Sequence, residues 1–354
     1  MNYRQEVATL DYQKTLDKKR SKYIVIYTTI TILLITLFLL NISLGTISIS
    51  FKEVINILLG RPIEDSISTS VVREIRLPRG IGAMLSGAAL SLAGLLMQIF
   101  FQNPIVDPFV LGISSGATLM VGLVTLTGIT MGLPQQSPHI LVLAALLGAI
   151  IVMFIITGIA SKVKNIITLL VIGLMLGYLC SAIINILVAF AEKESIRNFV
   201  VWTMGSFSGF TWDRVGLLAG ISIPVILSSL LISKPLNALL LGEEYARSMG
   251  VKIKGFRLSI VCLSSILTGI VTAFAGPVAF VGLAVPHLSR LLLGTDDNRI
   301  LIPGAVLLGA TLTILCDLLA RLLLSPVELP ISAVTSFVGA PIVIYLLVKR
   351  RDSL

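Results

Sequence analysis

The chain has 354 residues, of which 56% are hydrophobic and 13% are charged, with a mean hydropathy of +1.00. A soluble globular domain usually carries about 25% charged residues. One water-surrounded core of this length cannot bury so much apolar surface, so the composition excludes a soluble globule and favours a membrane protein.

The N-terminal end combines a polar segment with a long apolar run. Residues 1–22 are polar and basic, and the apolar run extends from Tyr23 to about residue 44. A signal peptide has a shorter apolar stretch that ends in a small-residue cleavage site, whereas this run is longer and contains no such site. We therefore interpret residues 1–22 as a basic tail and the run as a retained first membrane span.

Nine further apolar runs follow, each close to the roughly 17–25 residues that cross a bilayer as a helix. The expected spans are 23–44, 77–101, 108–128, 139–160, 166–190, 214–233, 258–275, 277–293, 300–322 and 330–348. The sequence thus predicts an all-α, polytopic membrane protein of about ten transmembrane helices. Residues 23–348 form one transmembrane domain, and residues 349–354 form a short C-terminal tail.

The distribution of Lys and Arg orients these spans. An N-terminus in the cytoplasm places 18 of the 27 Lys and Arg residues on the cytoplasmic side and 9 outside. This is the excess that the positive-inside rule requires, so both termini are predicted to be cytoplasmic. Topology therefore explains the net charge of +9, and no nucleic-acid partner is expected.

Three stretches are too polar to span a membrane. Residues 45–76 form an outer segment, in which FKEVINILLG has the apolar spacing of a helix. Residues 191–213 form a second outer segment, whose Trp202 and Trp212 are typical of anchors at a membrane interface. Residues 234–257 form the longest inner loop.

The inner loop 234–257 has the pattern of two short helices. An apolar face of leucines precedes Gly242, and Glu243, Glu244 and Arg247 then place charge on the second helix. From this pattern alone, a docking surface for a soluble partner and an interfacial helix among lipid headgroups are equally good interpretations.

Glycine and proline residues interrupt several of the apolar runs. Gly276-Pro277, Gly282 and Pro286 interrupt one stretch, and broken backbone in lipid often lines a transport path. The prolines at 103–108 are better explained as helix termination. Close helix packing is predicted by three GxxxG sequences, GISSG at 112–116, GLMLG at 173–177 and GLLAG at 216–220.

No chemistry-bearing cluster is evident. The cysteines Cys180, Cys262 and Cys316 lie apart in apolar runs, and His139 and His287 belong to no zinc-site pattern. No GxxxxGK[ST] phosphate loop occurs, so any ATP that drives this protein must bind another chain. We expect no cofactor, no metal and no enzymatic activity in this chain.

Six segments carry information beyond apolarity. They are RLPRGIGAMLSGAALSLAGLLMQIFFQNPIVDPFVLGISSGA at 76–117, WTMGSFSGFTW at 202–212, LNALLLGEEYARSMGV at 236–251, AGPVAFVGLAVPHLSRLLLGTDDNRILIPGAVLLGA at 275–310, DLLAR at 317–321 and ELPISAVTSFVGAPIVIYLL at 328–347. In order and spacing they resemble the FecCD-type permeases, the membrane subunits of ABC importers for iron siderophores, haem and cobalamin. The resemblance covers nearly the whole chain from about residue 45.

The resemblance implies a type II ABC importer permease bundle in a bacterial cell membrane. It further implies a homodimer with the translocation path on its two-fold axis, two separate ATP-binding subunits on the cytoplasmic side and a substrate-binding protein docked outside. The expected cargo is an iron(III)-siderophore or a related metal chelate, with haem and cobalamin left open.

The resemblance also assigns three sets of site residues. It implies that Arg76, Arg79 and Arg321 dock acidic residues of the binding protein, although headgroup contact or local pairing, such as Arg321 with Asp317 one turn earlier, is the alternative. The implied contact with the ATPase is Leu241, Gly242, Glu243, Glu244, Ala246 and Arg247. The candidate inner gate at the start of the fifth span is Ile166, Ile167 and Thr168, for which ordinary helix packing is an equal alternative.

The sequence supports two other functions less well than an importer permease. A secondary transporter driven by an ion gradient usually carries ionisable residues in mid-span, and here only Asp317 lies well inside a span, with Arg321 beside it. A membrane enzyme needs a converging catalytic set, and the sequence offers none.

Overall fold

The computed structural model describes residues 2–45, 47, 49–61, 66–128, 138–160, 162–163 and 165–351. Lys164, which entered the charge count, lies outside the described residues, as do residue 1 and residues 352–354 of the two predicted tails. The elements are α1 (Asn2–Ser43), α2 (Phe51–Leu58), α3 (Ser66–Ser70), the π-helix Val71–Arg76, α4 (Leu77–Phe100), the 3₁₀-helix Pro108–Leu111, α5 (Ile113–Thr127), α6 (Pro138–Ala160), α7 (Ile166–Phe190), α8 (Lys193–Thr203), α9 (Trp212–Leu231), α10 (Ser233–Leu240), α11 (Glu243–Ser248), α12 (Ile253–Ala275), α13 (Val281–Leu293), α14 (Asn298–Leu322) and α15 (Ile331–Arg351). No strand occurs among the described residues, so the predicted all-α class is confirmed.

The apolar helices agree with the predicted spans. Within the described residues, seven helices are long and apolar enough to cross a membrane: Lys19–Ser43, Ile67–Phe100, His139–Ala160, Ile166–Phe190, Trp212–Leu231, Ile253–Ala275 and Asn298–Leu322. Three shorter apolar helices match the predicted third, eighth and tenth spans: Ile113–Thr127, Val281–Leu293 and Ile331–Tyr345. Together they make up the predicted set of ten, and the chain is a multi-pass membrane protein.

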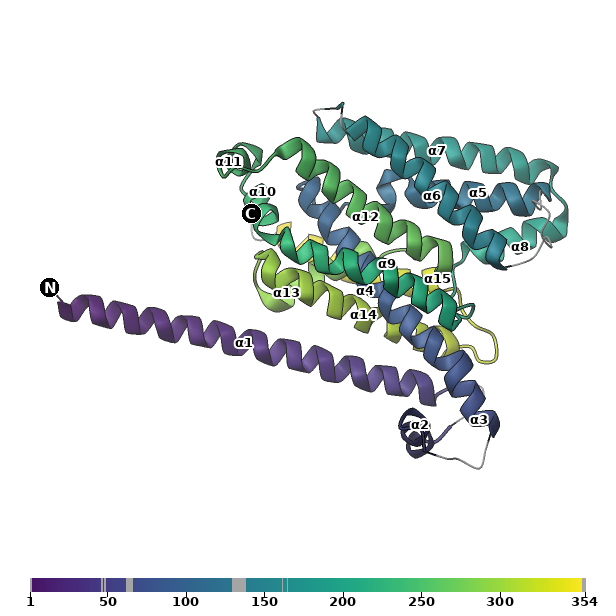
Figure 1. Cartoon of the computed structure of the whole chain (residues 1–354), viewed down its shortest axis with the longest axis horizontal. Coiled ribbons are helices and arrows are strands. Elements are labelled where there is room, and N and C mark those ends of the chain that lie inside the picture. The colour runs from purple at the N-terminus through teal and green to yellow at the C-terminus, as the bar shows by residue number, and fades with distance from the viewer. Residues whose placement is uncertain are drawn as a thin grey trace.

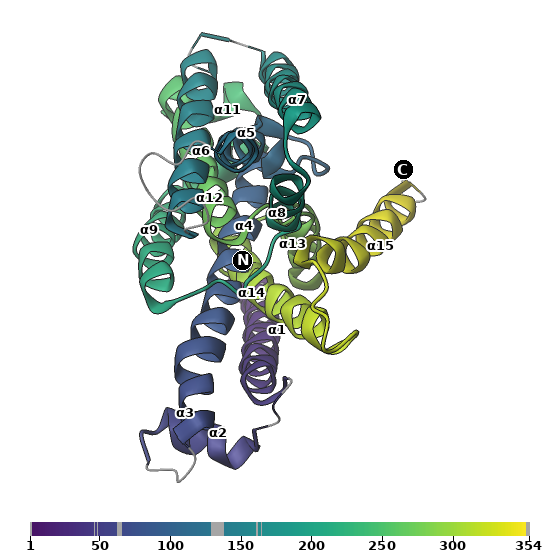
Figure 2. The ribbon, with the colours of Figure 1, turned by 90° about the vertical axis from the view of Figure 1, so that its right-hand side faces the viewer.

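Helix α4 lies at the centre of the bundle, with α9, α12, α13 and α14 packed around it (Figures 1 and 2). Glycine permits the closest approaches. A Cβ added at Gly87 would overlap the backbone carbonyl of Gly309 on α14, and one at Gly94 would overlap that of Gly282 on α13. The backbones of α13 and α14 therefore rest directly on α4, the close contact that small residues allow in lipid.

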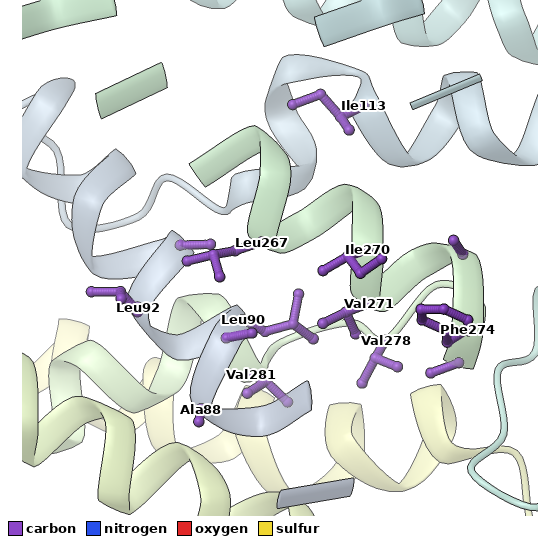
Figure 3. Close-up of a cluster of buried hydrophobic side chains, with 14 of the residues drawn as sticks. Ala88, Leu90, Leu92, Ile113, Leu267, Ile270, Val271, Phe274, Val278 and Val281 are labelled. Atoms are coloured by element: carbon purple, nitrogen blue, oxygen red, sulfur yellow. The ribbon is translucent and has the colours of Figure 1, made fainter. Parts of the chain in front are cut away.

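Figure 3 shows part of the apolar interior around α4. One buried apolar cluster contains Leu90 of α4, Leu267 and Val271 of α12, and Val278 and Val281 from the next segment of the chain. All five side chains are fully buried. Since lipid is as apolar as these side chains, close packing rather than exclusion of water holds this interior together.

Two of the three GxxxG sequences lie at close helix contacts. Gly116 faces Gly148 on α6, and Gly112 approaches Gly173 on α7. A Cβ added at Gly216 or Gly220 would meet nothing within 4 Å. The third motif, GLLAG at 216–220, therefore makes no such contact within the described chain.

The helix breaks refine three predicted boundaries. The expected termination at 103–108 is confirmed, and the third span begins only at Ile113, because Gly112 at φ +76° separates α5 from the preceding 3₁₀-helix. The eighth span begins at Val281, after a non-helical stretch that ends with Phe280 at φ +67°. Helix α12 begins at Ile253, inside the predicted loop 234–257.

The first predicted outer segment is more helical than expected. FKEVINIL forms α2, which Ser50 and Glu53 close with a reciprocal capping box. Residues 66–76, predicted as part of the polar segment, instead continue helically into α4, so that the second apolar helix starts at Ile67. The reason is that Val72 is fully buried against the apolar side chains of α1 and α2.

Two long helices keep large apolar faces uncovered. α1 runs along one side of the bundle, and α7 lies with α5 and α6 on the other (Figure 1). Only 17% of the apolar window is buried in each of them. Such faces require lipid or another protein chain against them.

Candidate docking surfaces and transport path

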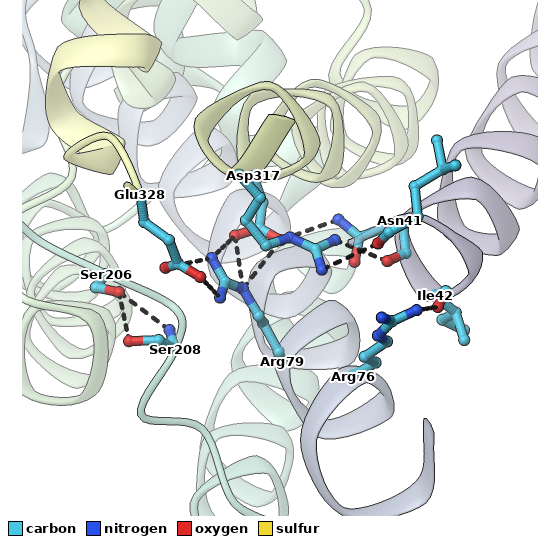
Figure 4. Close-up of polar contacts among 10 residues, drawn as sticks. Asn41, Ile42, Arg76, Arg79, Ser206, Ser208, Asp317 and Glu328 are labelled. Atoms are coloured by element: carbon cyan, nitrogen blue, oxygen red, sulfur yellow. Dashed lines mark hydrogen bonds and ion pairs between the residues drawn. The ribbon is translucent and has the colours of Figure 1, made fainter. Parts of the chain in front are cut away.

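The three arginines predicted to dock a partner lie close together where α4 begins and α14 ends. Figure 4 shows Arg76 and Arg79 at this place. Arg79 is the centre of the group. Its Nε donates to Oδ1 of Asp317 at 3.0 Å, and its Nη1 and Nη2 donate to the two carboxylate oxygens of Glu328 at 2.7 and 3.1 Å. Arg79 thus ties α4 both to α14 and to the connection that precedes α15.

Asp317 is a buried, fully engaged carboxylate. Its side chain is 1% exposed, and it pairs with Arg79 at 2.9 Å and with Arg321 at 3.5 Å. The side-chain amide of Asn41 on α1 also donates to Asp317 at 2.9 Å. A buried charge is tolerated when it is paired and hydrogen-bonded in this way. The predicted pairing of Arg321 with Asp317 is confirmed.

Arg76 and Arg321 also close the C-terminal end of α1. Nη1 of Arg76 donates to the carbonyls of Ile42 and Ser43 at 2.6 and 2.8 Å, and Nη2 of Arg321 donates to the carbonyl of Asn41 at 2.7 Å. The last carbonyls of a helix lack partners within it, and the helix dipole favours a cation there. Both arginines therefore have a structural role, and docking through the three arginines stays a prediction.

The predicted ATPase contact lies on α11 and on the turn that joins it to α10, at the opposite end of the bundle from α2 and α3 (Figure 1). Leu241 is 68% exposed, and Glu244 and Arg247 are exposed as well. Tyr245 and Met249, which the sequence did not single out, extend the same exposed surface. α11 thus presents apolar and charged side chains together, as a docking surface does.

The remaining members of this set hold α11 in place. Ala246 is fully buried against Ala238 of α10 and Ile253 of α12. Glu243 accepts a hydrogen bond from Nε of Arg257 at 2.9 Å. Gly242, at φ +108°, makes the turn between α10 and α11.

Asn237 ties α10 to the first turn of α14. Its Oδ1 accepts from the backbone and side-chain N–H groups of Asn298, each at 2.8 Å, and its Nδ2 donates to Oδ1 of Asp297 at 2.6 Å. Asp297 also caps α14 through the backbone N–H of Arg299. These contacts border a polar cleft of about 570 Å³ beside α10 and α11, which together form the predicted coupling segment.

The candidate gate forms the first turn of α7. Oδ1 of Asn165 caps the helix by accepting from the backbone N–H of Ile167 at 2.8 Å. The side chain of Ile167 is 70% exposed and Thr168 is exposed, whereas Ile166 packs partly on the core. A cleft of about 430 Å³ separates this turn from Glu243, so the structure brings the gate candidate beside the coupling segment.

A third cleft, of about 350 Å³, lies between α5, α7 and the break that precedes α13. Pro277 and Ala279 of the break line it, together with Ser114, Ser115, Thr118 and Ser181. Hydroxyl groups beside interrupted backbone are typical of a path through an apolar bundle. The role of the 276–286 interruption in a transport path stays a prediction.

Comparison with known proteins decides the family. The model of the FecCD transport family matches residues 33–349, most of the chain. The chain belongs to the FecCD transport family. Its fold accordingly resembles the type II ABC importer permeases, as the sequence predicted.

Relatives of this FecCD member are similar over most of their length. The vitamin B12 import system permease protein BtuC of Escherichia coli O9:H4 (strain HS) is 39% identical over 280 residues, 79% of this chain and 84% of BtuC. The hemin transport system permease protein HmuU of Yersinia pestis is 35% identical over 327 residues, 91% of this chain and 94% of HmuU. A solved inward-facing structure, described as a putative metal-chelate type ABC transporter, has a TM-score of 0.81 and 30% identity, and covers 92% of this chain and 99% of its own.

Membership in the FecCD family makes the chain a permease subunit of an ABC importer and not an enzyme, because separate subunits hydrolyse ATP in such importers. Among the described residues, no three His, Cys, Asp or Glu side chains lie close enough to hold a metal ion. The expectation that this FecCD chain carries no cofactor of its own stays a prediction.

Sequence reasoning missed three residues that complete these surfaces. Glu328 lies within a quoted segment, ELPISAVTSFVGAPIVIYLL, yet nothing local indicates that it binds Arg79. Asn41 and Asn237 are polar residues next to apolar runs, and this pattern was the available signal for both. A lone Asn at the end of an apolar helix is a candidate for a buried hydrogen bond, because an unpaired amide is costly there.

Proposed function

We propose that the chain is the membrane-spanning subunit of a binding-protein-dependent importer that carries an iron(III)-siderophore or a related metal chelate, haem or cobalamin, into the cytoplasm. The observation that carries this proposal is the match, over 92% of the chain, to the structure described as a putative metal-chelate type ABC transporter. The named relatives BtuC and HmuU are permeases for vitamin B12 and hemin, and both cargoes are metal chelates.

The orientation in our proposal places α10 and α11 in the cytoplasm, with both termini on the same side. The excess of Lys and Arg predicted for that side supports it. Two ATP-binding subunits then dock on Leu241, Glu244 and Arg247, whose exposure suits a protein contact. The binding protein docks at the other end, where Arg79 and its neighbours lie.

We further propose a homodimer in a bacterial cell membrane, with the transport path along its two-fold axis. The uncovered apolar face of α7 supports this arrangement, because Ile167 and Tyr178 are each more than half exposed in the single chain. On α15, Phe337 is exposed in the same way. Pairing of two chains over these helices would enclose the hydroxyl-lined cleft beside Ser114 and Ser181.

The gradient-driven alternative lacks a supporting observation. Coupling to an ion gradient needs an ionisable group that can bind and release the ion. Asp317 is buried between Arg79 and Arg321 and is therefore unsuited to that task.

Uptake by the assembled transporter tests the choice of cargo. Cells that express the permease, its ATPase and its binding protein receive a ferric siderophore, haemin or cyanocobalamin at equal concentration. We expect accumulation of the ferric siderophore, abolished when the binding protein is deleted. Accumulation of haemin or cyanocobalamin alone would show that this compound, and not the siderophore, is the cargo, and would still support the metal-chelate class. Accumulation of none of the three would contradict that class.

A further inference from the structure

Of the two carboxylates that pair with Arg79, Glu328 is the exposed one. Its side chain is 44% exposed, whereas that of Arg79 is 8% exposed and that of Asp317 is 1% exposed. Figure 4 shows Glu328 and Asp317 on two sides of the guanidinium group. Glu328 is thus the solvent-facing member of this buried group.

The contacts of Arg79 leave no free edge for a second carboxylate. Nη1 and Nη2 face the two oxygens of Glu328 at 2.7 and 3.1 Å, which is a bidentate pair. Nε donates to Asp317, and Nη2 also lies 2.9 Å from that carboxylate. A partner's carboxylate therefore cannot grip Arg79 bidentately while Glu328 remains in place.

Glu328 is also the group that is able to leave. It lies in the non-helical connection 323–330, and Arg79 is the only hydrogen-bonding partner of its side chain within the described chain. Asp317 is part of α14 and additionally holds Asn41 and Arg321. Removing Asp317 would leave several buried groups with fewer partners, whereas removal of Glu328 leaves Arg79 still paired with Asp317.

We propose that Glu328 is an intramolecular placeholder, which occupies Arg79 in the undocked permease and is displaced by a carboxylate of the binding protein. This inference rests on the proposed docking role of Arg79. The exchange replaces one carboxylate by another, so the charge of the cluster does not change and Arg79 is never left unpaired. Glu328 consequently weakens docking and keeps the binding protein releasable.

The test measures affinity for the binding protein. The permease is assembled with its ATPase subunits in lipid nanodiscs, and the probe is the purified binding protein that stimulates the ATPase of this assembly. In Glu328→Gln the affinity should rise by about three- to tenfold, the range of one charge-assisted pair at a partly exposed site. Glu328→Ala, which also removes the amide hydrogen bond, should raise it at least as much.

Two controls separate the placeholder from a general charge effect. Glu74→Gln removes an exposed carboxylate from the turn that precedes Arg76, and Glu74 forms no ion pair among the described residues. It should change the affinity by less than about twofold. Arg79→Lys keeps the charge but loses the fork, so it should weaken binding by about tenfold or more and make Glu328→Gln neutral in that background.

The results distinguish failure of the placeholder proposal from failure of the docking proposal. If Arg79→Lys weakens binding but both Glu328 variants leave affinity unchanged or lower it, the placeholder is wrong and docking at Arg79 stands. An equal gain from Glu328→Gln with and without Arg79→Lys also overturns the placeholder. If Arg79→Lys leaves affinity unchanged in an assembly with normal thermal stability, the docking proposal itself fails.

Discussion

Asn237 of α10 accepts two hydrogen bonds from Asn298 of α14, one from the backbone N–H and one from the side-chain amide, each at 2.8 Å. The far end of α14 carries Asp317, which holds Arg79 and Arg321. One helix of 25 residues, about 38 Å long at 1.5 Å per residue, therefore joins the coupling segment to the arginine cluster.

We predict that Asn237→Ala weakens communication between the two ends. The substitution frees α10 from α14 and leaves the buried amide of Asn298 with fewer partners, which should cost about 1–3 kcal/mol of stability. Stimulation of ATPase activity by the binding protein should fall at least about threefold, a drop that corresponds to about 0.7 kcal/mol of coupling. Lys234→Ala, on the exposed side of the same helix, is the matched control. Full stimulation in Asn237→Ala would show that α14 does not transmit this signal.

A second prediction concerns the exposed surface of α11. Reversing the charges of Glu244 and Arg247 together should weaken assembly with the ATPase subunits or uncouple hydrolysis from transport, because both side chains face outward. Co-purification and ATP-dependent uptake are the measurements. Lys19→Glu, an exposed reversal on α1, should leave both unchanged. Normal assembly and normal uptake in the double reversal would place the ATPase contact elsewhere.

Glycine contacts supply a third prediction. Gly94→Ala adds a methyl group where the backbone of Gly282 already lies, so α4 and α13 must separate. Overpacking of this kind typically costs about 1–3 kcal/mol. Thermal unfolding in detergent should show a lower midpoint for Gly94→Ala, while Gly220→Ala, whose new methyl group meets nothing within 4 Å, keeps the parent midpoint or exceeds it. Equal midpoints in the two variants would contradict the packing described here.

The candidate gate can be tested by cross-linking between protomers. In a background without Cys180, Cys262 and Cys316, a cysteine at Ile167 should form a disulfide with the same residue of a second copy, because this side chain is exposed at the start of α7. A cysteine at Leu169, which is buried within its own chain, should not. Failure at positions 166, 167 and 168 would return these residues to ordinary packing or lipid contact.

The sequence predicted the ten apolar helices because lipid imposes a length of about 20 apolar residues on each of them. It also predicted the pair Asp317–Arg321, since residues four apart on a helix are neighbours. It could not predict Arg79–Glu328 or Asn41–Asp317, because 249 and 276 residues separate the partners and no periodicity reports such contacts.

The sequence also could not predict which residues are buried in short helical segments. α11 has six residues, too few for apolar periodicity to distinguish buried Ala246 from exposed Glu244, and the family resemblance implies docking for both. Residues 66–76 were assigned to a polar segment on composition, whereas burial of Val72 against Ile42 and Val54 keeps them helical. In both places tertiary contact decided what local pattern left open.

ATP-dependent uptake into proteoliposomes distinguishes an ABC importer from a transporter driven by an ion gradient. Vesicles that contain the permease with its ATPase subunits receive the binding protein and a ferric siderophore outside, and either ATP inside or an imposed proton or sodium gradient. We expect uptake with ATP alone, no uptake with a gradient alone, and only background ATP hydrolysis from the permease without its ATPase subunits. Gradient-driven uptake by the permease in the absence of ATP and of the ATPase subunits would contradict it.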